Sequence, residues 1–317
     1  MTSERLLLGA HLGQQNLGME ELRALWCHLD QAGLDWISLW DHLYEAPNQG
    51  GVLPHFEAVA SLAALACDTT NARLGCLVFY VGYRNPGLLA RAAVTIDHLS
   101  GGRFELGLGA GWHEWEAEAY GYDFPSVGTR IDMLEEATQL IGSLLTQERT
   151  DFNGRHYRAV NASLVPKPVN DHLPTWIGGR GEKKTLRIAA RHADGWNAAY
   201  VSAEEFRHLN GVLDHWCEVE GRDPSTIERS VNLLFELGSD STDVSRRAVE
   251  FTQQWGAGAD RVRQGALVGT PDRAAEQVLA YRDAGADLVN IALRAPVDAD
   301  VLDAYLFDVV PTLRVGP

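Results

Sequence analysis

The feature that most restricts the fold of this chain is a repeated alternation between short apolar runs and amphipathic segments. The first apolar run, residues 6–9, precedes residues 19–32, in which apolar side chains recur at the spacing of a helix. The same order repeats, so that four predicted strands alternate with three predicted helices by residue 110. Strands that alternate with helices form parallel sheets with right-handed crossovers. The first third of the chain therefore predicts an α/β fold.

The alternation continues to the end of the chain and reaches eight strand-like units without a linker between them. We predict a single α/β domain over residues 1–317, a (β/α)8 TIM barrel with an insertion after its fourth strand. The pattern loosens at about residues 112–173, which we interpret as an excursion from the barrel, and an Asn153-Gly154 pair within it predicts a hairpin. The predicted strands are residues 6–9, 36–40, 73–80, 104–108, 175–177, 195–198, 230–236 and 288–293.

Composition limits the classes of partner. The formal net charge is -16, which argues against a general surface for nucleic acid or anionic membranes, because such surfaces are basic. The cysteines (Cys27, Cys67, Cys76 and Cys217) lie far apart in apolar or helical contexts, as buried thiols in a reducing compartment do. The N-terminus is polar, and no apolar run approaches the roughly 20 residues of a membrane span. We expect a soluble, cytoplasmic protein.

Chemistry in such a barrel lies at the carboxyl ends of the strands. This sequence places aromatic, acid/base and glycine-rich groups there, and their recurrence at one topological position favours a functional rim over isolated structural residues. The side chains at these ends are His11, Asp41, His42, Tyr80, Tyr83, Trp112, His113, Glu114, Asn197, Tyr200, Glu236 and Arg294.

A glycine-rich stretch, Gly178-Gly-Arg-Gly-Glu-Lys-Lys-Thr185, is the clearest binding signal. Its glycines bring backbone N–H groups close to a helix N-terminus, and its cations favour binding of a phosphate. The alternative interpretation is a glycine-rich turn followed by a solvent-exposed basic helix face, which would have the same sequence pattern. The spacing is not that of a P-loop. A second glycine run, Gly107-Leu-Gly-Ala-Gly111, lacks the Rossmann spacing, and we interpret it as a barrel strand narrowed so that a flat ring system can lie against it.

Histidines at three strand ends (His11, His42 and His113) could in principle hold a metal ion. Metal-dependent hydrolases on this barrel usually show a His-x-His on the first strand, and His11 has no such partner. The segment that begins His113-Glu114 is not a zinc-protease H-E-x-x-H motif either. A metal-dependent barrel hydrolase is therefore kept only as a minor alternative, and we assign no metal ligand.

Five segments together resemble the luciferase-like monooxygenase superfamily and, within it, the coenzyme F420-dependent oxidoreductases. The resemblance extends from residue 6 to about residue 295, and it implies a barrel that is commonly a homodimer, with a deazaflavin or flavin across the barrel mouth. The segments are Trp40-Asp-His42, Tyr83-Arg-Asn-Pro86, Leu99-Ser-Gly-Gly-Arg-Phe-Glu-Leu-Gly-Leu-Gly-Ala-Gly-Trp-His-Glu114, Ile177-Gly-Gly-Arg-Gly-Glu-Lys-Lys-Thr185 and Ala193-Asp-Gly-Trp-Asn197.

The resemblance also implies residue roles. Asp41 would hydrogen-bond the cofactor ring or ribityl region, and His42 would face the reacting ring carbon as an acid/base or substrate anchor. The other cofactor contacts would be a bulge with a non-proline cis peptide at Cys76, Leu77 and Val78, a strip at Ala110, Gly111 and Trp112, and a phosphate site at Gly178, Gly179 and Arg180. The candidate acids are His42, His113 and Glu114, and the substrate pocket is expected at His11, Tyr44, Tyr83 and Arg294.

Two positions differ from the alcohol- and sugar-phosphate-oxidising relatives. Ala46 stands where those relatives have tryptophan, and Trp112 stands where they have glutamate, so reduction or hydroxylation of a larger organic molecule is at least as expected as alcohol oxidation. The function hypothesis is an F420-dependent oxidoreductase that moves a hydride between the deazaflavin C5 and an unidentified small-molecule substrate. The alternatives are an FMN-dependent monooxygenase supplied by a separate reductase, the metal-dependent hydrolase and a non-catalytic flavin-binding barrel.

Overall fold

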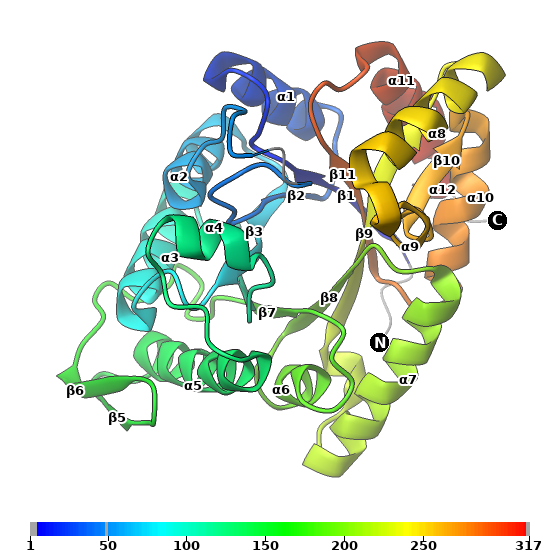
Figure 1. Cartoon of the computed structure of the whole chain (residues 1–317). Coiled ribbons are helices and arrows are strands. Elements are labelled where there is room, and N and C mark those ends of the chain that lie inside the picture. Colours follow the sequence, from blue (N-terminus) through cyan, green and yellow to red (C-terminus); the bar gives the residue numbers. More distant parts are fainter. Residues whose placement is uncertain (1–4, 48–49, 315–317) are drawn as a thin grey trace.

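A computed structural model describes residues 5–47 and 50–314 and has a closed parallel barrel at its centre (Figure 1). Each barrel strand pairs in parallel with the next one, and β11 returns to pair with β1. The predicted (β/α)8 barrel is confirmed. Its strands are β1 (Leu7–Leu12), β2 (Trp36–Leu39), β3 (Arg73–Tyr80), β4 (Phe104–Gly109), β7 (Thr175–Gly178), β8 (Gly195–Ala199), β9 (Glu228–Leu237) and β11 (Leu288–Leu293).

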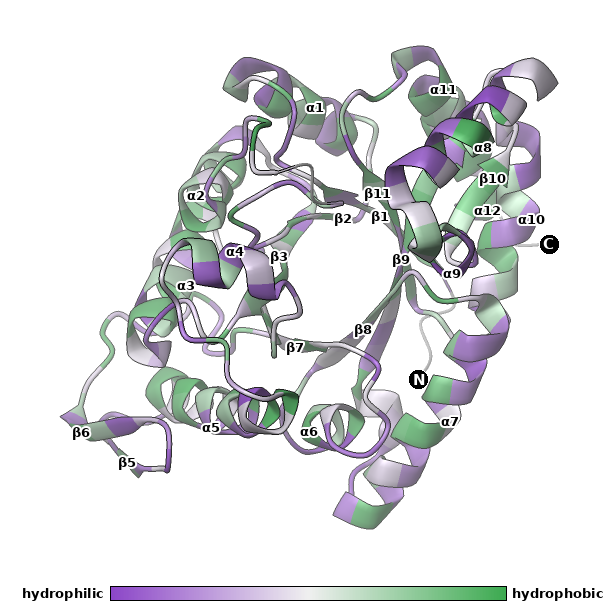
Figure 2. Ribbon diagram, viewed as in Figure 1, coloured by the Kyte–Doolittle hydropathy of each residue, from purple (hydrophilic) through white to green (hydrophobic). Residues whose placement is uncertain are grey.

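Helices surround the barrel, and their surfaces are divided into hydrophobic and hydrophilic sides, as the colours along α7 show (Figure 2). Local signals set their limits: α3 begins at Pro86 with the Asn85 side chain accepting the N–H of Gly87, and it ends at Gly101 in the left-handed region. The ring contains α1 (Met19–Gln31), α2 (Ala58–Asp68), α3 (Pro86–Ser100), α5 (Val127–Thr146), α6 (Thr185–His192), α7 (Ala203–Glu220), α10 (Pro271–Arg282), α11 (Ala299–Ala304) and α12 (Val310–Arg314), with a π-helical turn at Tyr305–Val309 and a 3-10 turn at Pro224–Thr226.

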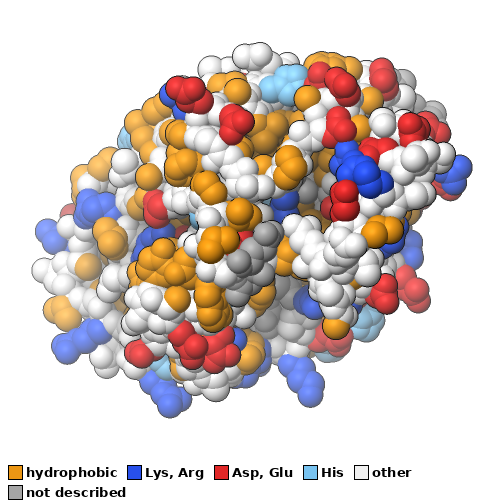
Figure 3. Space-filling view, turned by 45° about the horizontal axis from the view of Figure 1, so that its top comes forward, with side chains coloured by type: hydrophobic (Ala, Val, Ile, Leu, Met, Phe, Trp, Pro, Cys, Tyr) orange, Lys and Arg blue, Asp and Glu red, His pale blue; other side chains and the backbone are white. Residues whose placement is uncertain are grey.

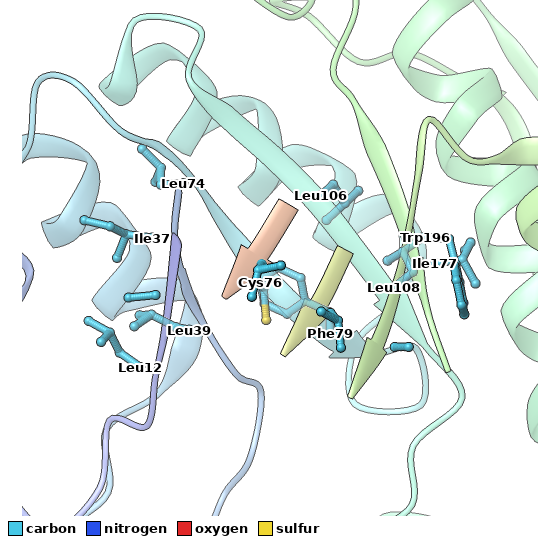
Figure 4. Packing of buried hydrophobic residues seen from close by; sticks show 14 of the residues in the cluster. Leu12, Ile37, Leu39, Leu74, Cys76, Phe79, Leu106, Leu108, Ile177 and Trp196 are labelled. Carbon is cyan, nitrogen blue, oxygen red and sulfur yellow. The ribbon is translucent and has the colours of Figure 1, made fainter. Parts of the chain in front are cut away.

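The main hydrophobic core lies between the strands and the helices. Figure 4 shows part of it, where side chains from several strands pack together. At the amino-terminal end of the barrel, Trp36 and Trp176 pack against each other, and the Trp176 indole N–H donates to the buried carboxylate of Glu105. Arg73 bridges Glu105 and Glu228 at the same end. This end of the barrel is closed by packing and ion pairs, so a ligand site belongs at the opposite end.

The predicted excursion consists of two parts separated by a ring helix. Helix α5 packs between α3 and α6 and so belongs to the ring. Before it, a loop carries the short helix α4 (Glu114–Ala119), which Figure 1 shows over the strand ends. After it comes the predicted hairpin, formed by antiparallel β5 (Thr150–Asn153) and β6 (Arg158–Ala162). Only the first part lies near the barrel mouth.

A second local core covers the barrel between β9 and β11. Strand β10 (Ala266–Gly269), which is not among the eight predicted strands, extends the sheet beside β9. Helices α8 (Ser241–Trp255) and α9 (Ala259–Arg263), joined by a 3-10 turn at Gly256–Gly258, pack over it. Buried side chains of β9, α8, α9, β10 and β11 form this small core: Leu234, Phe251, Ala259, Ala266 and Ala292.

The surface agrees with the compositional limits, whereas the expected burial of the thiols holds only in part. Acidic, basic and hydrophobic side chains are interspersed on the face shown in Figure 3. The cysteines are all free thiols; Cys76 and Cys217 are buried as expected, but Cys27 is half-buried and Cys67 is exposed. Within the described residues, none of the helices has the length and apolarity needed to cross a lipid bilayer. The residues 1–4, which belong to the polar N-terminus discussed above, lie outside the described residues.

Candidate functional site

A cavity of about 570 Å³ opens at the carboxyl ends of the barrel strands. Its walls come from the ends of the barrel strands and from the loops that follow them, with α5 and the end of α8 completing the rim. This is where (β/α)8 enzymes place their chemistry. The predicted residues that line it are His11, Asp41, His42, Leu77, Val78, Tyr83, Ala110, Gly111, Trp112, His113, Gly178, Gly179, Arg180 and Arg294.

Three predicted site residues lie outside the cavity lining. Glu114 is exposed on α4, and Tyr44 packs its ring 4.7 Å from that of Trp115 and 5.3 Å from that of Tyr120. Cys76 is fully buried in the core between the barrel and its helices (Figure 4). The physical reason is side-chain direction, since successive residues of a strand or helix face different ways.

The carboxylate at the centre of the site is Glu116, which the sequence reasoning did not select. Its Oε1 accepts from Nδ1 of His42 at 2.8 Å and from the Tyr83 hydroxyl at 3.0 Å. Its Oε2 accepts from the backbone N–H groups of Leu43 and Tyr44 at 2.9 and 3.2 Å. Glu116 is only 2% exposed, so these donors replace water around the carboxylate.

The charge state of Glu116 follows from these donors. Burial alone would raise its pKa, but the hydrogen bond and charge of His42, together with the Leu43 N–H, outweigh burial and hold the pKa below its usual value. Glu116 is therefore ionised at neutral pH, and its carboxylate accepts a hydrogen bond from the Nδ1–H group of His42. Because Nδ1 is engaged, Nε2 is the ring nitrogen of His42 that remains for a ligand in the cavity.

His113 has a different role from His42 in this arrangement. Its Nδ1 accepts the backbone N–H of Glu116 at 3.4 Å, so it caps the start of α4. Burial lowers its pKa, and the attraction of Glu116 only partly opposes this effect. His113 thus fixes the helix that carries Glu116 and lies 5.7 Å from the His42 ring. The pattern His-x-x-Glu resembles a capping box, which is the signal that could have identified Glu116 in the sequence.

Asp41 is buried beside an arginine. Its Oδ2 accepts from Arg84 at 2.7 Å and from the N–H of Tyr80 at 3.1 Å, which leaves Oδ1 as the oxygen for a ligand. Burial raises the pKa of Asp41 to about 6, and Arg84 limits the rise. Arg84 also contacts Glu57 at 2.6 Å, so the guanidinium is held from two sides.

The back wall of the cavity is a bulge in β3. The pairing register with β4 shifts between Cys76 and Phe79, and the Leu77–Val78 peptide bond is cis. The Val78 side chain fits against two glycines: a β-carbon added at Gly109 or Gly178 would lie 2.3 or 2.6 Å from it. The glycines therefore let the strands approach this wall closely, which makes room for a flat group.

The glycine-rich loop after β7 offers fewer free donors than its sequence implied. The N–H of Gly179 donates to the carbonyl of Asn197 at 3.0 Å. The Arg180 side chain contacts Glu205 at 3.2 Å, and Lys184 contacts Asp132 at 2.8 Å. A phosphate at this loop would have to draw Arg180 away from Glu205 or use other N–H groups of the loop.

Two arginines line the cavity from opposite ends of the chain. Arg130, on α5, is 7% exposed, donates to the carbonyl oxygens of Ala110 and Pro125 and lies 3.8 Å from the Phe124 ring centroid. Arg294 follows β11 and donates to the hydroxyl of Tyr200 at 3.1 Å. Among the described residues, the hydrogen bonds of both guanidinium groups go only to uncharged oxygen atoms.

The strand-end histidines do not assemble a metal site. The described residues contain no cluster of three or more His, Cys, Asp or Glu side chains suited to a metal ion. His11 instead contacts the Ser38 hydroxyl through Nδ1 at 2.9 Å, and burial, with the nearby charges of Arg294 and His42, lowers its pKa to about 3. The described structure thus offers the hydrolase alternative no ligand set.

Comparison with known proteins identifies the family. Residues 6–259 match the luciferase-like monooxygenase family. The chain is 28% identical over 340 residues to an F420-dependent glucose-6-phosphate dehydrogenase of Nocardia farcinica, with 98% of each chain covered. Its fold is similar to that of an F420-dependent secondary alcohol dehydrogenase (TM-score 0.85, 17% identity, 98% and 99% covered) and to a monooxygenase of Streptomyces bottropensis (0.77, 19%, 97% and 99%). The predicted resemblance is confirmed, and the chain belongs to the luciferase-like monooxygenase family.

Proposed function

We propose that this protein is a coenzyme F420-dependent oxidoreductase that acts on an organic substrate in the cavity. The observation that carries the proposal is the His42–Glu116 pair at the mouth of a cavity with a glycine-lined back wall, in a chain related to F420-dependent dehydrogenases. The Val78 side chain occupies the space that β-carbons at Gly109 and Gly178 would need, so a side chain at either position would displace Val78, and this close packing of the wall supports the fit of a flat ring beside it.

F420, when bound, supplies a ring carbon that gives or takes a hydride. This chain's residues bind and orient the reactants. Asp41 Oδ1 is the acceptor for a ring or ribityl donor, and Leu77, Val78, Ala110, Gly111 and Trp112 form the wall beside it. A phosphate of the cofactor would bind at the loop formed by Gly178, Gly179 and Arg180. The cations of the same segment, which could attract the anionic tail of the cofactor, are Arg180, Lys183 and Lys184.

His42 would carry the accompanying proton at Nε2. Glu116 orients its ring through Nδ1, and an oriented imidazole can exchange a proton with a substrate oxygen or nitrogen. Because Glu114 is exposed, we transfer the proposed acid/base support from Glu114 to Glu116. Ala46 lines the cavity where the alcohol- and sugar-phosphate-oxidising relatives have tryptophan, and the smaller side chain leaves more room, which favours a larger substrate than a simple alcohol.

Titration of the purified protein with F420 and with FMN, followed by fluorescence, tests the proposal. We expect saturable F420 binding that Asp41→Ala weakens. Tight FMN binding without F420 binding would overturn it in favour of an FMN-dependent monooxygenase served by a separate reductase, which the family and the Streptomyces neighbour support. Light scattering would test the homodimer that the resemblance implies.

A further inference from the structure

Arg294 is a cation whose donors are incompletely used. It follows β11, lines the cavity, and donates from Nη2 to the Tyr200 hydroxyl at 3.1 Å. Its Nε and Nη1 atoms are buried and have no hydrogen-bond partner among the described residues. Unpaired buried donors are costly, and more so on a charged group. Such donors indicate a partner that the described residues do not provide.

Three aromatic rings hold the guanidinium in place. Its central carbon lies 5.3 Å from the ring centroid of Trp40, 5.2 Å from that of Tyr200 and 4.9 Å from that of Trp255. These rings come from three separate elements: the end of β2, the loop after β8 and the end of α8. Cation–π attraction offsets part of the desolvation cost but supplies no acceptor for the Nε and Nη1 protons.

Arg294 also lacks a counter-charge at contact distance within the described residues. Two neighbouring arginines do have one: Arg247 pairs with Asp243 and Asp298, and Arg261 pairs with Glu205. Glu236, near the end of the adjacent strand, forms no ion pair with Arg294 in the described structure. Burial raises the pKa of Glu236 to about 7 against the opposing charges of Arg294 and Arg247, so that near neutral pH Glu236 carries only part of a negative charge. His11, which also lies near Arg294, is neutral there.

We propose that Arg294 anchors an anionic group, a carboxylate or a phosphate, on the substrate. The inference rests on the proposed function only in taking this cavity as the substrate site. The indole ring of Trp40 lies beside both Arg294 and His42. The centroids of the Trp40 and His42 rings are 5.7 Å apart. Arg294 and His42 therefore lie near the same indole ring and line the same cavity, within reach of one substrate. The substrate class is an organic anion that contacts both side chains.

Binding of simple anions to the cofactor-free protein tests this site without any turnover. Inorganic phosphate and benzoate are titrated separately at fixed ionic strength, and binding is followed by tryptophan fluorescence, since Trp40 and Trp255 contact the guanidinium, and by calorimetry. We expect at least one anion to saturate a single site. Because charge-assisted hydrogen bonds are lost, Arg294→Met should weaken its binding by at least about tenfold. Preference for benzoate or phosphate then tells which group the site accepts.

Two further variants keep the test decisive. Arg282→Met removes an exposed cation that pairs with Asp283 outside the cavity lining, and it should leave anion affinity within about twofold of the unchanged protein. Arg294→Lys keeps the positive charge, and its anion affinity is measured instead if Arg294→Met fails to fold. The proposal is overturned if neither anion binds, or if Arg294→Met keeps the anion affinity of the unchanged protein. F420 titration of the same samples is independent: F420 binding can fail, sinking the proposed cofactor, while the anion result stands.

Discussion

The Nδ1 atom of His42 lies 2.8 Å from Oε1 of Glu116, although 74 residues separate them in the chain. His42 follows β2, whereas Glu116 lies on α4, after β4. They meet because a closed barrel brings the ends of its strands to one rim. Nδ1 of His42 donates its hydrogen bond to Glu116, so Nε2 is the ring nitrogen that remains for a ligand in the cavity.

Replacing Glu116 by glutamine should release the His42 ring. The amide would place its own N–H₂ group against donors that now bond the carboxylate, and we expect a loss of about 2 kcal/mol of folding free energy. Long-range nitrogen–proton NMR should show the Nδ1–H tautomer of neutral His42 in the unchanged protein and a mixture in Glu116→Gln. Glu114→Gln, on the exposed side of the same helix, is the matched control and should change neither measurement. An equal response of both variants would contradict the assignment.

Gly178→Ala should impair cofactor binding. The added methyl would lie 2.6 Å from Val78, at the wall beside the cavity. We expect the dissociation constant for F420 to rise by at least about tenfold, measured by fluorescence titration. Gly142→Ala meets nothing within 4 Å and should leave binding unchanged while stabilising α5 by up to about 1 kcal/mol. Unaltered F420 affinity in Gly178→Ala would show that the cofactor does not use this wall.

Removing Arg84 should destabilise the protein in a pH-dependent way. Asp41, whose pKa is about 6 with Arg84 present, would lose its cation, and its pKa would rise further. At pH 8 the carboxylate would be buried and unpaired, so Arg84→Met should cost about 3 kcal/mol of unfolding free energy. At pH 5 Asp41 would be protonated, and the cost should be smaller. Urea unfolding at both pH values measures this, with Arg282→Met, an exposed pair partner of Asp283, as the control. An equal cost at both pH values would contradict the prediction.

Glu105, at the closed end of the barrel, should make stability fall as pH rises. Burial raises its pKa from 4.5 to about 7 in the folded protein, despite the opposing charge of Arg73. The folded state therefore holds a proton that the unfolded state has released between these pH values. Stability should be highest below pH 4.5 on this account and decline by about 3 kcal/mol as pH rises through 7. The measurement is the difference in unfolding free energy between the unchanged protein and Glu105→Gln at each pH. If that difference does not change with pH, Glu105 is not the titrating group.

The site was predictable to the extent that strand ends are visible in the sequence. Asp41 and His42 follow one short apolar run, and Gly178 follows another. All three residues were therefore expected at the rim, and all three line the cavity. Glu114 was also expected there but is exposed, because the turn into α4 decides which neighbour faces the cavity. The bulge that the resemblance implied at Cys76, Leu77 and Val78 is present, but the Cys76 side chain faces the core. A shift of one residue in a strand turns a side chain from the cavity to the core.

The sequence by itself determined the barrel, because helix and strand periodicity are local properties that repeat along the chain. It also determined the family, through segments such as Trp40-Asp-His42. Only the tertiary structure decided that Glu116 orients His42 and that Arg294 is enclosed by aromatic rings without an acidic partner. These relationships join residues far apart in the chain, and their free energies depend on burial and hydrogen-bond geometry, which no local pattern encodes.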